Sequence, residues 1–184
     1  GSVLGGEKVK ITGTNLGARF RLTSASSPGS TGTGGGNGEV EDYVASIAAP
    51  TTDFGDFSGF AAASSIANTT LRLGALVDKE YAATSNTDAT GDDITGSDDE
   101  DGVTMPSLTA GAPATIPVIV TNNTGSATFL NAWIDFNNNG VLTDAGEQVA
   151  TNVSIATGTT SGTQNLSVTV PANAVTGTNL GARF

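Results

Sequence analysis

Residues 164–170 read QNLSVTV, and this short stretch indicates the fold class. Leu166, Val168 and Val170 alternate with polar residues, so an extended chain would place the apolar side chains on one face and the polar side chains on the other. Residues 114–122 repeat the same alternation. A hydrophobic period of two predicts half-buried β-strands rather than helices.

Other segments carry comparable strand signals and are separated by turns rich in Gly, Asn, Asp and Thr. Pro117 lacks a backbone N–H, which predicts an edge position for its strand. Many short strands joined by turns are typical of a sandwich, so we expect an all-β fold, an antiparallel β-sandwich of Ig-like or jelly-roll-like type with long Gly/Ser and acidic loops. The expected strands are residues 18–23, 40–47, 70–73, 114–122, 129–136, 147–155 and 164–170.

Composition excludes several classes of function. The chain has 184 residues and a net charge of −11, which repels nucleic-acid phosphates and anionic lipid. It contains no cysteine and no histidine, so zinc sites, haem sites and histidine-dependent catalytic triads lose their usual residues. It also lacks an apolar run long enough to insert into a membrane. We therefore expect no enzyme, no nucleic-acid partner and no membrane insertion, and Ca²⁺ is the natural counter-charge.

An internal repeat indicates how the chain is organised. The sequence TGTNLGARF at residues 12–20 recurs letter for letter at residues 176–184, an offset of 164 residues, about the size of a sandwich domain. We expect a leader or tag-like segment at 1–11, with Gly1-Ser2 as a cleavage scar. The C-terminal part of one repeat would then occupy 12–47, a junction 48–62, and the main sandwich, lacking its last strands, 63–184.

The role of residues 12–47 has three readings. They could belong to a tandem array with a shifted register, or they could donate strands that complete a neighbouring subunit. A repeat cut at an arbitrary position, or a permuted one, would give the same pattern. Donation satisfies the backbone groups of an exposed sheet edge, and because the two surfaces differ, such contacts propagate into a filament.

The strongest chemical signal is the stretch DFNNNGVLTDAGE at residues 135–147. Oxygen-bearing side chains at its first, third and fifth positions, followed by a glycine, match the first half of a calcium-binding loop. The flanks are strand-like, so this would be a calcium loop on a β scaffold; the alternative is an Asx-rich turn without metal. The expected ligands are Asp135, Asn137, Asn139, the Val141 carbonyl, Asp144 and Glu147.

An acidic segment at residues 88–101 is the second candidate metal site. Its carboxylates would repel one another if they were packed together without a cation. The alternative is a solvated acidic loop. The expected calcium ligands are Asp92, Asp93, Asp98, Asp99, Glu100 and Asp101.

The stretch GEVEDY at residues 38–43 is the third candidate. On a strand, Glu39 and Glu41 share a face and Asp42 points to the other. We expect these three residues to bind calcium together with the acidic segment; a solvated strand face is the simpler alternative. A carboxylate pair could also hydrolyse a glycoside, although no aromatic sugar cleft is evident beside it.

Several motifs together resemble the GEVED domain of large secreted and cell-surface bacterial proteins, which often occurs beside adhesin-like modules. The motifs are ARFR at 18–21, GEVEDY at 38–43, GDD at 91–93, DDEDGV at 98–103 and AWIDFN at 132–137. Their order departs from the family pattern, in which ARFR and GEVEDY follow AWIDFN. The resemblance implies an extracellular or cell-surface location.

Taken together, the sequence predicts a calcium-stabilised extracellular structural or adhesive repeat module that could assemble into a filament. Possible further partners are a surface glycan or a protein. The main alternative is a carbohydrate-binding module of a secreted protein. Such a module needs exposed aromatic residues, and Trp133, the single tryptophan, is more typical of core or interface packing.

Overall fold

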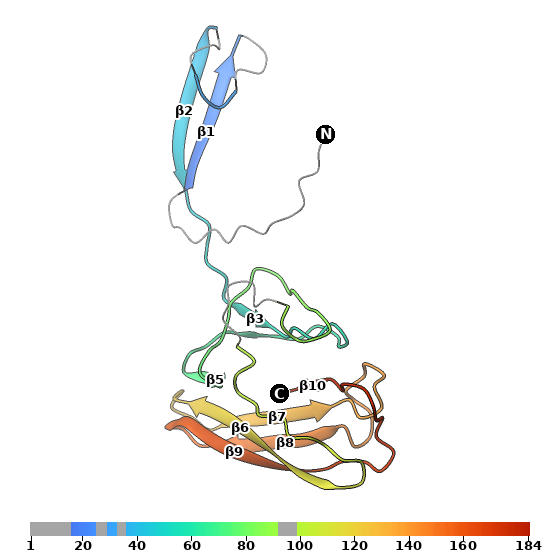
Figure 1. The fold of residues 1–184 in the computed structure, drawn as a ribbon. Helices are drawn as coiled ribbons and strands as arrows, with labels where there is room; N and C mark the ends of the chain where they lie inside the picture. The colour runs from blue at the N-terminus through green and yellow to red at the C-terminus, as the bar shows by residue number, and fades with distance from the viewer. Residues whose placement is uncertain (1–15, 25–28, 33–35, 92–98) are drawn as a thin grey trace. The chain divides into compact units, whose positions relative to one another are not determined.

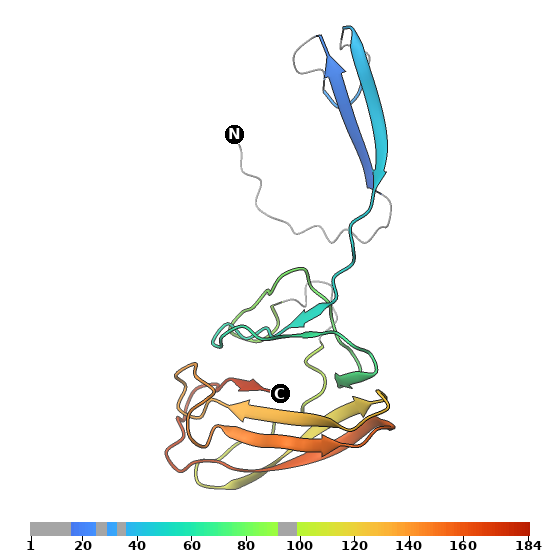
Figure 2. The ribbon, with the colours of Figure 1, turned by 180° about the vertical axis from the view of Figure 1, so that it is seen from behind.

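A computed structural model describes residues 16–24, 29–32, 36–91 and 99–184, and Figures 1 and 2 show it from two sides. The chain forms two compact units, Gly1–Ala49 and Pro50–Phe184. The expected all-β class is confirmed, because every regular element of the described residues is a strand. No helix in this part of the chain has the length and apolarity needed to cross a bilayer.

The larger unit is built around two three-stranded antiparallel sheets. One has the order β5-β6-β9, with β5 at Leu71–Leu73, β6 at Pro113–Asn122 and β9 at Thr159–Thr169. The other has the order β10-β7-β8, with β7 at Thr128–Ile134, β8 at Gln148–Ile155 and β10 at Ala182–Arg183. A short antiparallel pair, β3 (Thr52–Phe54) and β4 (Ser64–Ile66), precedes them.

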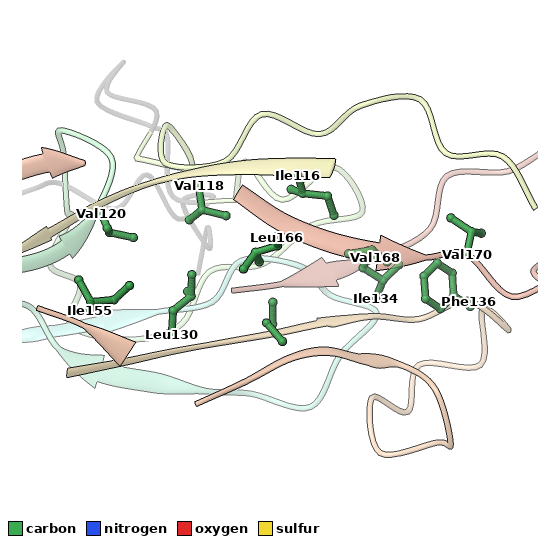
Figure 3. Packing of buried hydrophobic residues seen from close by; sticks show 12 residues of the cluster. Ile116, Val118, Val120, Leu130, Ile134, Phe136, Ile155, Leu166, Val168 and Val170 are labelled. Carbon is green, nitrogen blue, oxygen red and sulfur yellow. The ribbon is translucent and has the colours of Figure 1, made fainter. Parts of the chain in front are cut away.

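The alternating residues of both sheets form one core, shown in Figure 3. Along most of these strands the inward residues are buried and their neighbours are more exposed, as the alternation predicts; at the end of β6, Val120, Thr121 and Asn122 are all buried. Burying one such aliphatic side chain contributes about 1.5–3 kcal/mol. The core residues are Ile116, Val118, Val120, Leu130, Ala132, Ile134, Phe136, Ala150, Ile155, Leu166, Val168 and Val170.

The sequence predicted an edge position for the strand that contains Pro117. This prediction is wrong, because β6 lies between β5 and β9. The carbonyl of Pro117 accepts a hydrogen bond from the Thr104 N–H. The carbonyl of Ile119 accepts one from the Gly74 N–H, and the Ile119 N–H donates to the Gly102 carbonyl. The backbone carbonyls of Pro117 and Ile119 therefore point away from β9. On this side β5 pairs only with residues 120–122, and Val118 makes an isolated bridge to Val103. Among the described residues, no strand therefore pairs with Pro117 there, and its missing N–H interrupts no strand ladder.

One short strand, β3, lies where the sequence predicted a junction at residues 48–62, and its partner β4 follows just after it. β3 pairs with β4 through Thr52–Ile66 and Phe54–Ser64, and Phe60 is buried. The structure thus places this stretch within the larger unit, which begins at Pro50. The sequence did not predict β3 or β4, because three residues carry little periodicity.

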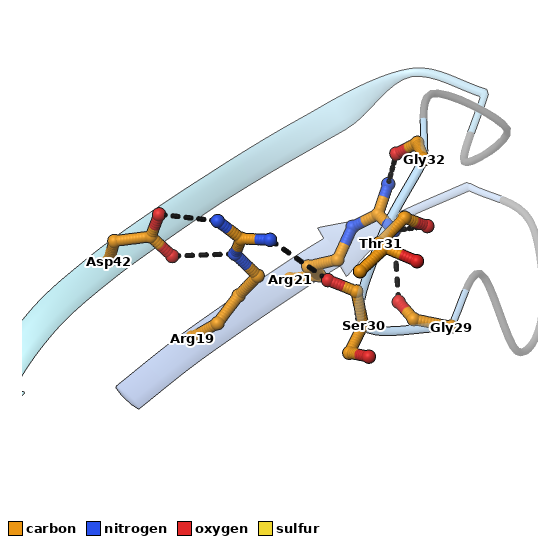
Figure 4. A network of polar contacts seen from close by, with 7 residues as sticks. All are labelled: Arg19, Arg21, Gly29, Ser30, Thr31, Gly32 and Asp42. Atoms are coloured by element: carbon orange, nitrogen blue, oxygen red, sulfur yellow. Dashed lines mark hydrogen bonds and ion pairs between the residues drawn. The ribbon is translucent and has the colours of Figure 1, made fainter. Parts of the chain in front are cut away.

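The smaller unit contains an antiparallel hairpin. β1 (Leu16–Thr23) pairs with β2 (Gly38–Ala45) along its whole length. Arg19 and Arg21 donate to backbone carbonyls of the connecting loop at residues 29–32 (Figure 4). Most side chains of the hairpin are exposed, including Phe20 and Leu22. The hairpin therefore presents apolar residues that its own unit does not bury.

Candidate functional site

The connection from β7 to β8, residues 135–147, folds around a buried aspartate. The carboxylate of Asp135, only 2% exposed, accepts the N–H groups of Gly140 at 2.7 Å and Asn139 at 3.1 Å. Gly140 has a φ of +80°, a left-handed conformation that suits glycine. The buried carboxylate thus draws the loop into a tight turn around its first residue.

Two asparagines and Asp144 form the exposed side of the same turn. The side-chain amides of Asn137 and Asn139 each donate to Asp144 Oδ2 at 2.8 Å. Their side-chain oxygens accept the N–H groups of Asn139 at 3.1 Å and Val141 at 2.8 Å. The hydrogen bonds from Asn137, and then from Asn139, lower the pKa of Asp144. The two amides therefore favour the charged form of Asp144.

Glu147 closes the loop from inside. Its side chain is 2% exposed, and its Oε1 accepts the Asn137 N–H at a long 3.4 Å. Within the described part of the chain, its buried Oε2 has no hydrogen-bond partner. Burial raises the pKa of Glu147, the N–H of Asn137 lowers it, and the negative charges of Asp135 and Asp144 raise it further. A buried, poorly satisfied carboxylate facing two other acids is a place where a cation would remove a large electrostatic cost.

The structure therefore brings five of the six expected ligands of this loop into one hydrogen-bonded group: Asp135, Asn137, Asn139, Asp144 and Glu147. Val141 joins it through its N–H, which donates to Asn139. Oxygen donors of this kind are those that Ca²⁺ prefers. That a metal binds here stays a prediction.

A second acidic group lies elsewhere in the larger unit. Carboxylate oxygens of Asp56, Asp99 and Glu100 lie within 4.8 Å of one another, an arrangement that could hold a metal ion. Asp56 is 4% exposed, and Asp99 also accepts the N–H of Asp78 at 2.9 Å. The sequence pointed to Asp99 and Glu100 but missed Asp56. Asp56 is the second of two acids in DFGDF at residues 53–57, and acids among phenylalanines were the available signal.

The remaining acids of the expected second site are placed differently. Both carboxylate oxygens of Asp101 accept the N–H of Ala75 at 3.1 Å, so this side chain holds the turn after β5. The predicted ligands Asp92, Asp93 and Asp98 lie outside the described residues. Their ligand role, like that of Asp101, stays a prediction.

The C-terminal half of the sandwich, which carries the Asp135–Glu147 loop, can be compared with known families. Residues 129–184 match the GEVED domain. The match runs from β7 to the C-terminal segment, so it contains the whole loop together with β8, β9 and β10. The resemblance read from the sequence motifs is therefore confirmed over this segment. No curated protein and no solved structure matches the chain.

The GEVEDY stretch at residues 38–43 lies outside the segment that matches the GEVED domain and forms β2. Asp42 accepts from Arg19 Nε at 2.6 Å and Nη2 at 2.7 Å (Figure 4), and this arginine lowers the pKa of Asp42. Glu41 accepts the hydroxyl of Tyr43, and the bond raises the pKa of that tyrosine. Glu39 is exposed. An arginine thus already supplies a positive charge to Asp42, and calcium binding by these three acids stays a prediction.

Proposed function

We propose that this chain is a non-enzymatic, calcium-stabilised structural or adhesive repeat module that acts outside the bacterial cell. The observation that carries the proposal is Glu147, a buried carboxylate with one oxygen unpartnered in the described structure, in a loop that also contains Asp135 and Asp144. The net charge of −11 and the match to the GEVED domain support it.

The donor set fits a hard cation. Ca²⁺ takes six to eight oxygen ligands, and the loop offers carboxylates, asparagine oxygens and the Val141 carbonyl. The amides of Asn137 and Asn139 now donate to Asp144. Ion binding would replace these two hydrogen bonds, and the amide oxygens would become ligands. With three carboxylates the affinity should be modest, in the range of about 10⁻⁴–10⁻³ M that suits extracellular modules.

Several observations favour a structural role over catalysis. Glu39 and Glu41, the carboxylate pair that could serve a hydrolase, lie on an exposed hairpin. The sequence lacks the histidine and cysteine on which many nucleophilic mechanisms depend. A core made rigid by an ion instead of disulfides is consistent with a cysteine-free protein in an oxidising, calcium-rich environment.

Calcium binding is best tested by calorimetric titration of the chelator-treated protein with Ca²⁺, with Mg²⁺ as the competing ion. We expect saturable binding of Ca²⁺, weaker binding of Mg²⁺, and loss of the loop site in Glu147→Gln. The matched control is Asp88→Asn, which removes one exposed negative charge outside the loop. Equal Ca²⁺ binding by the wild type and Glu147→Gln would refute the assignment of the loop.

A carbohydrate-binding function is the second candidate, and one observation favours it. Two aromatic residues of β7, Phe129 and Trp133, line a cavity of about 740 Å³. Aromatic rings in a groove are a common platform for sugars. A glycan array would decide: glycan binding by the wild type that is lost in Trp133→Ala would establish this function.

A further inference from the structure

The candidate calcium loop between β7 and β8 contacts a turn that lies much earlier in the sequence. This turn runs from Phe57 to Phe60, and the N–H of its last residue donates to the carbonyl of its first at 3.3 Å. The Gly59 carbonyl lies against Gly140 of the loop, because a Cβ added to Gly140 would come within 2.7 Å of that oxygen. The N–H of Gly140 is in turn held by the buried carboxylate of Asp135 at 2.7 Å. One side of the turn therefore rests on a residue that an expected calcium ligand holds in place.

A second connection between the turn and the loop runs through Gly181, just before β10. Its carbonyl accepts the Asp135 N–H at 3.0 Å and so holds the first residue of the loop. The rings of Phe57 and Phe60 pack against the same glycine, since an added Cβ would come within 2.6 Å and 2.5 Å of them. The two rings also meet edge to face, with centroids 4.8 Å apart. A residue without a side chain is therefore needed where the rings meet the loop.

Arg183 of β10 holds the turn through its side chain. Its guanidinium carbon lies 5.1 Å from the centre of the Phe60 ring, a cation–π distance. Its Nη1 donates to the Ala61 carbonyl at 3.0 Å. The same residue of the other LGARF copy, Arg19, instead pairs with Asp42. The two identical copies thus have different neighbours, and one can serve as a control for the other.

We propose that the Phe57–Phe60 turn positions the calcium loop, so that Ca²⁺ binding and closure of the turn strengthen one another. This inference deepens the proposed calcium-stabilised role and rests on it. An ion in the loop would fix Asp135. Through its N–H and its carboxylate, Asp135 holds Gly181 and Gly140, the two residues on which the turn rests. Because coupling between two sites is reciprocal, the turn raises the affinity for calcium by the factor by which calcium favours the closed turn.

This coupling gives the ion an effect beyond its own loop. The Phe57–Phe60 turn connects β3 to β4, and both strands lie outside the segment that matches the GEVED domain. The turn is also bound to a further part of the chain, since the Ser58 N–H donates to the Asn86 carbonyl at 2.8 Å. Calcium in the C-terminal half would therefore hold the connection between β3 and β4 on the sandwich.

Amide hydrogen exchange in EDTA and in excess Ca²⁺ tests the coupling. The probe is the Ser58 N–H, whose hydrogen bond to Asn86 breaks when the turn opens. We expect calcium to slow its exchange by about fivefold or more, as for other coupled sites. The control is the Ala67 N–H, which follows β4 and donates to the Thr51 carbonyl at 2.9 Å. Its exchange should stay the same, because its opening does not release the loop.

The two LGARF copies supply a matched pair of variants. Gly181→Ala places a methyl group against both rings, whereas Gly17→Ala, at the same position of the other copy, meets nothing within 4 Å in the described structure. By calorimetric titration, Gly181→Ala should bind Ca²⁺ about fivefold more weakly than the wild type, or worse, and Gly17→Ala should bind it equally well. Phe60→Leu keeps an apolar side chain and leaves Gly181 intact, and it should weaken Ca²⁺ binding in the same direction.

Three outcomes would overturn the proposal. Calcium that binds the wild type without slowing the exchange of Ser58 would leave the calcium loop in place and remove the coupling. Slowing that persists in Glu147→Gln would assign the effect to the acidic group that contains Asp56, next to the turn. Unchanged affinity in Phe60→Leu would mean that Gly181 acts on the loop without the turn. A wild type that binds no calcium would instead refute the proposed function, so the two failures are distinguishable.

Discussion

Replacing Glu147 by glutamine keeps the size of a buried side chain and removes its charge, so it tests the candidate calcium loop directly. The carboxylate is 2% exposed, and its Oε2 has no hydrogen-bond partner among the described residues. A buried unsatisfied polar group costs about 1–3 kcal/mol, and a charged one costs more. In chelator, Glu147→Gln should therefore be more stable than the wild type by about 1–3 kcal/mol.

Calcium should reverse this order. An ion that binds only the folded state at a concentration of about 100 times its Kd stabilises by about 2.7 kcal/mol. The wild type gains this stabilisation, whereas Glu147→Gln loses a ligand and with it most of the gain. The wild type should then be the more stable of the two.

Thermal unfolding followed by circular dichroism, in EDTA and in excess Ca²⁺, measures both differences. One kcal/mol corresponds to a Tm shift of about 2–4 °C for a chain of this size. Asp88→Asn, which removes an exposed charge, should follow the wild type in both conditions. The reasoning is refuted if Glu147→Gln is destabilised equally in EDTA and in calcium, or if calcium raises the Tm of both proteins by the same amount.

Three further predictions concern acidity, the loop turn and the core. Folding raises the pKa of Glu147, so the contribution of this group to stability is fully present below the ordinary glutamate pKa and is lost as the pH rises through its folded value. In EDTA, the stability of the wild type relative to Glu147→Gln should therefore increase on acidification. Urea titrations in which this difference in stability does not change with pH would contradict the prediction. A Cβ at Gly140 would lie 2.7 Å from the Gly59 carbonyl oxygen, whereas Gly158, at a similar φ, has nothing within 4 Å; Gly140→Ala should thus cost about 1–3 kcal/mol and clearly more than Gly158→Ala, as measured by urea denaturation. Ile134→Ala removes a core side chain that is 1% exposed and should cost about 2–5 kcal/mol, whereas Ile66→Ala, at an 82% exposed position, should change stability by less than about 0.5 kcal/mol; equal midpoints for the two variants would place the core elsewhere.

The hydrophobic pattern was sufficient to predict the main strands. Leu166, Val168 and Val170 point into the core as their alternation predicts, because a half-buried strand needs an apolar residue at every second position. The Asp135–Glu147 loop was also visible in the sequence. Its oxygen-bearing residues are close together along the chain, and local spacing alone brings them into one turn.

Other features depended on contacts between residues far apart in the sequence. Asp56 lies more than forty residues from Asp99, and only folding brings their carboxylates together. The central position of β6 could not be predicted from Pro117, because a strand is an edge or not according to its neighbours.

The sequence by itself determined which residues face inward, where the turns occur, and that residues 12–20 and 176–184 are equivalent. These are local properties, set by side-chain alternation, turn chemistry and identity of sequence. Only the tertiary structure decided that Glu147 is buried with an oxygen unpartnered in the described structure, and that β10 covers two residues of the β7 edge. Burial and edge coverage depend on which distant segments pack together, and no single stretch of sequence contains that information.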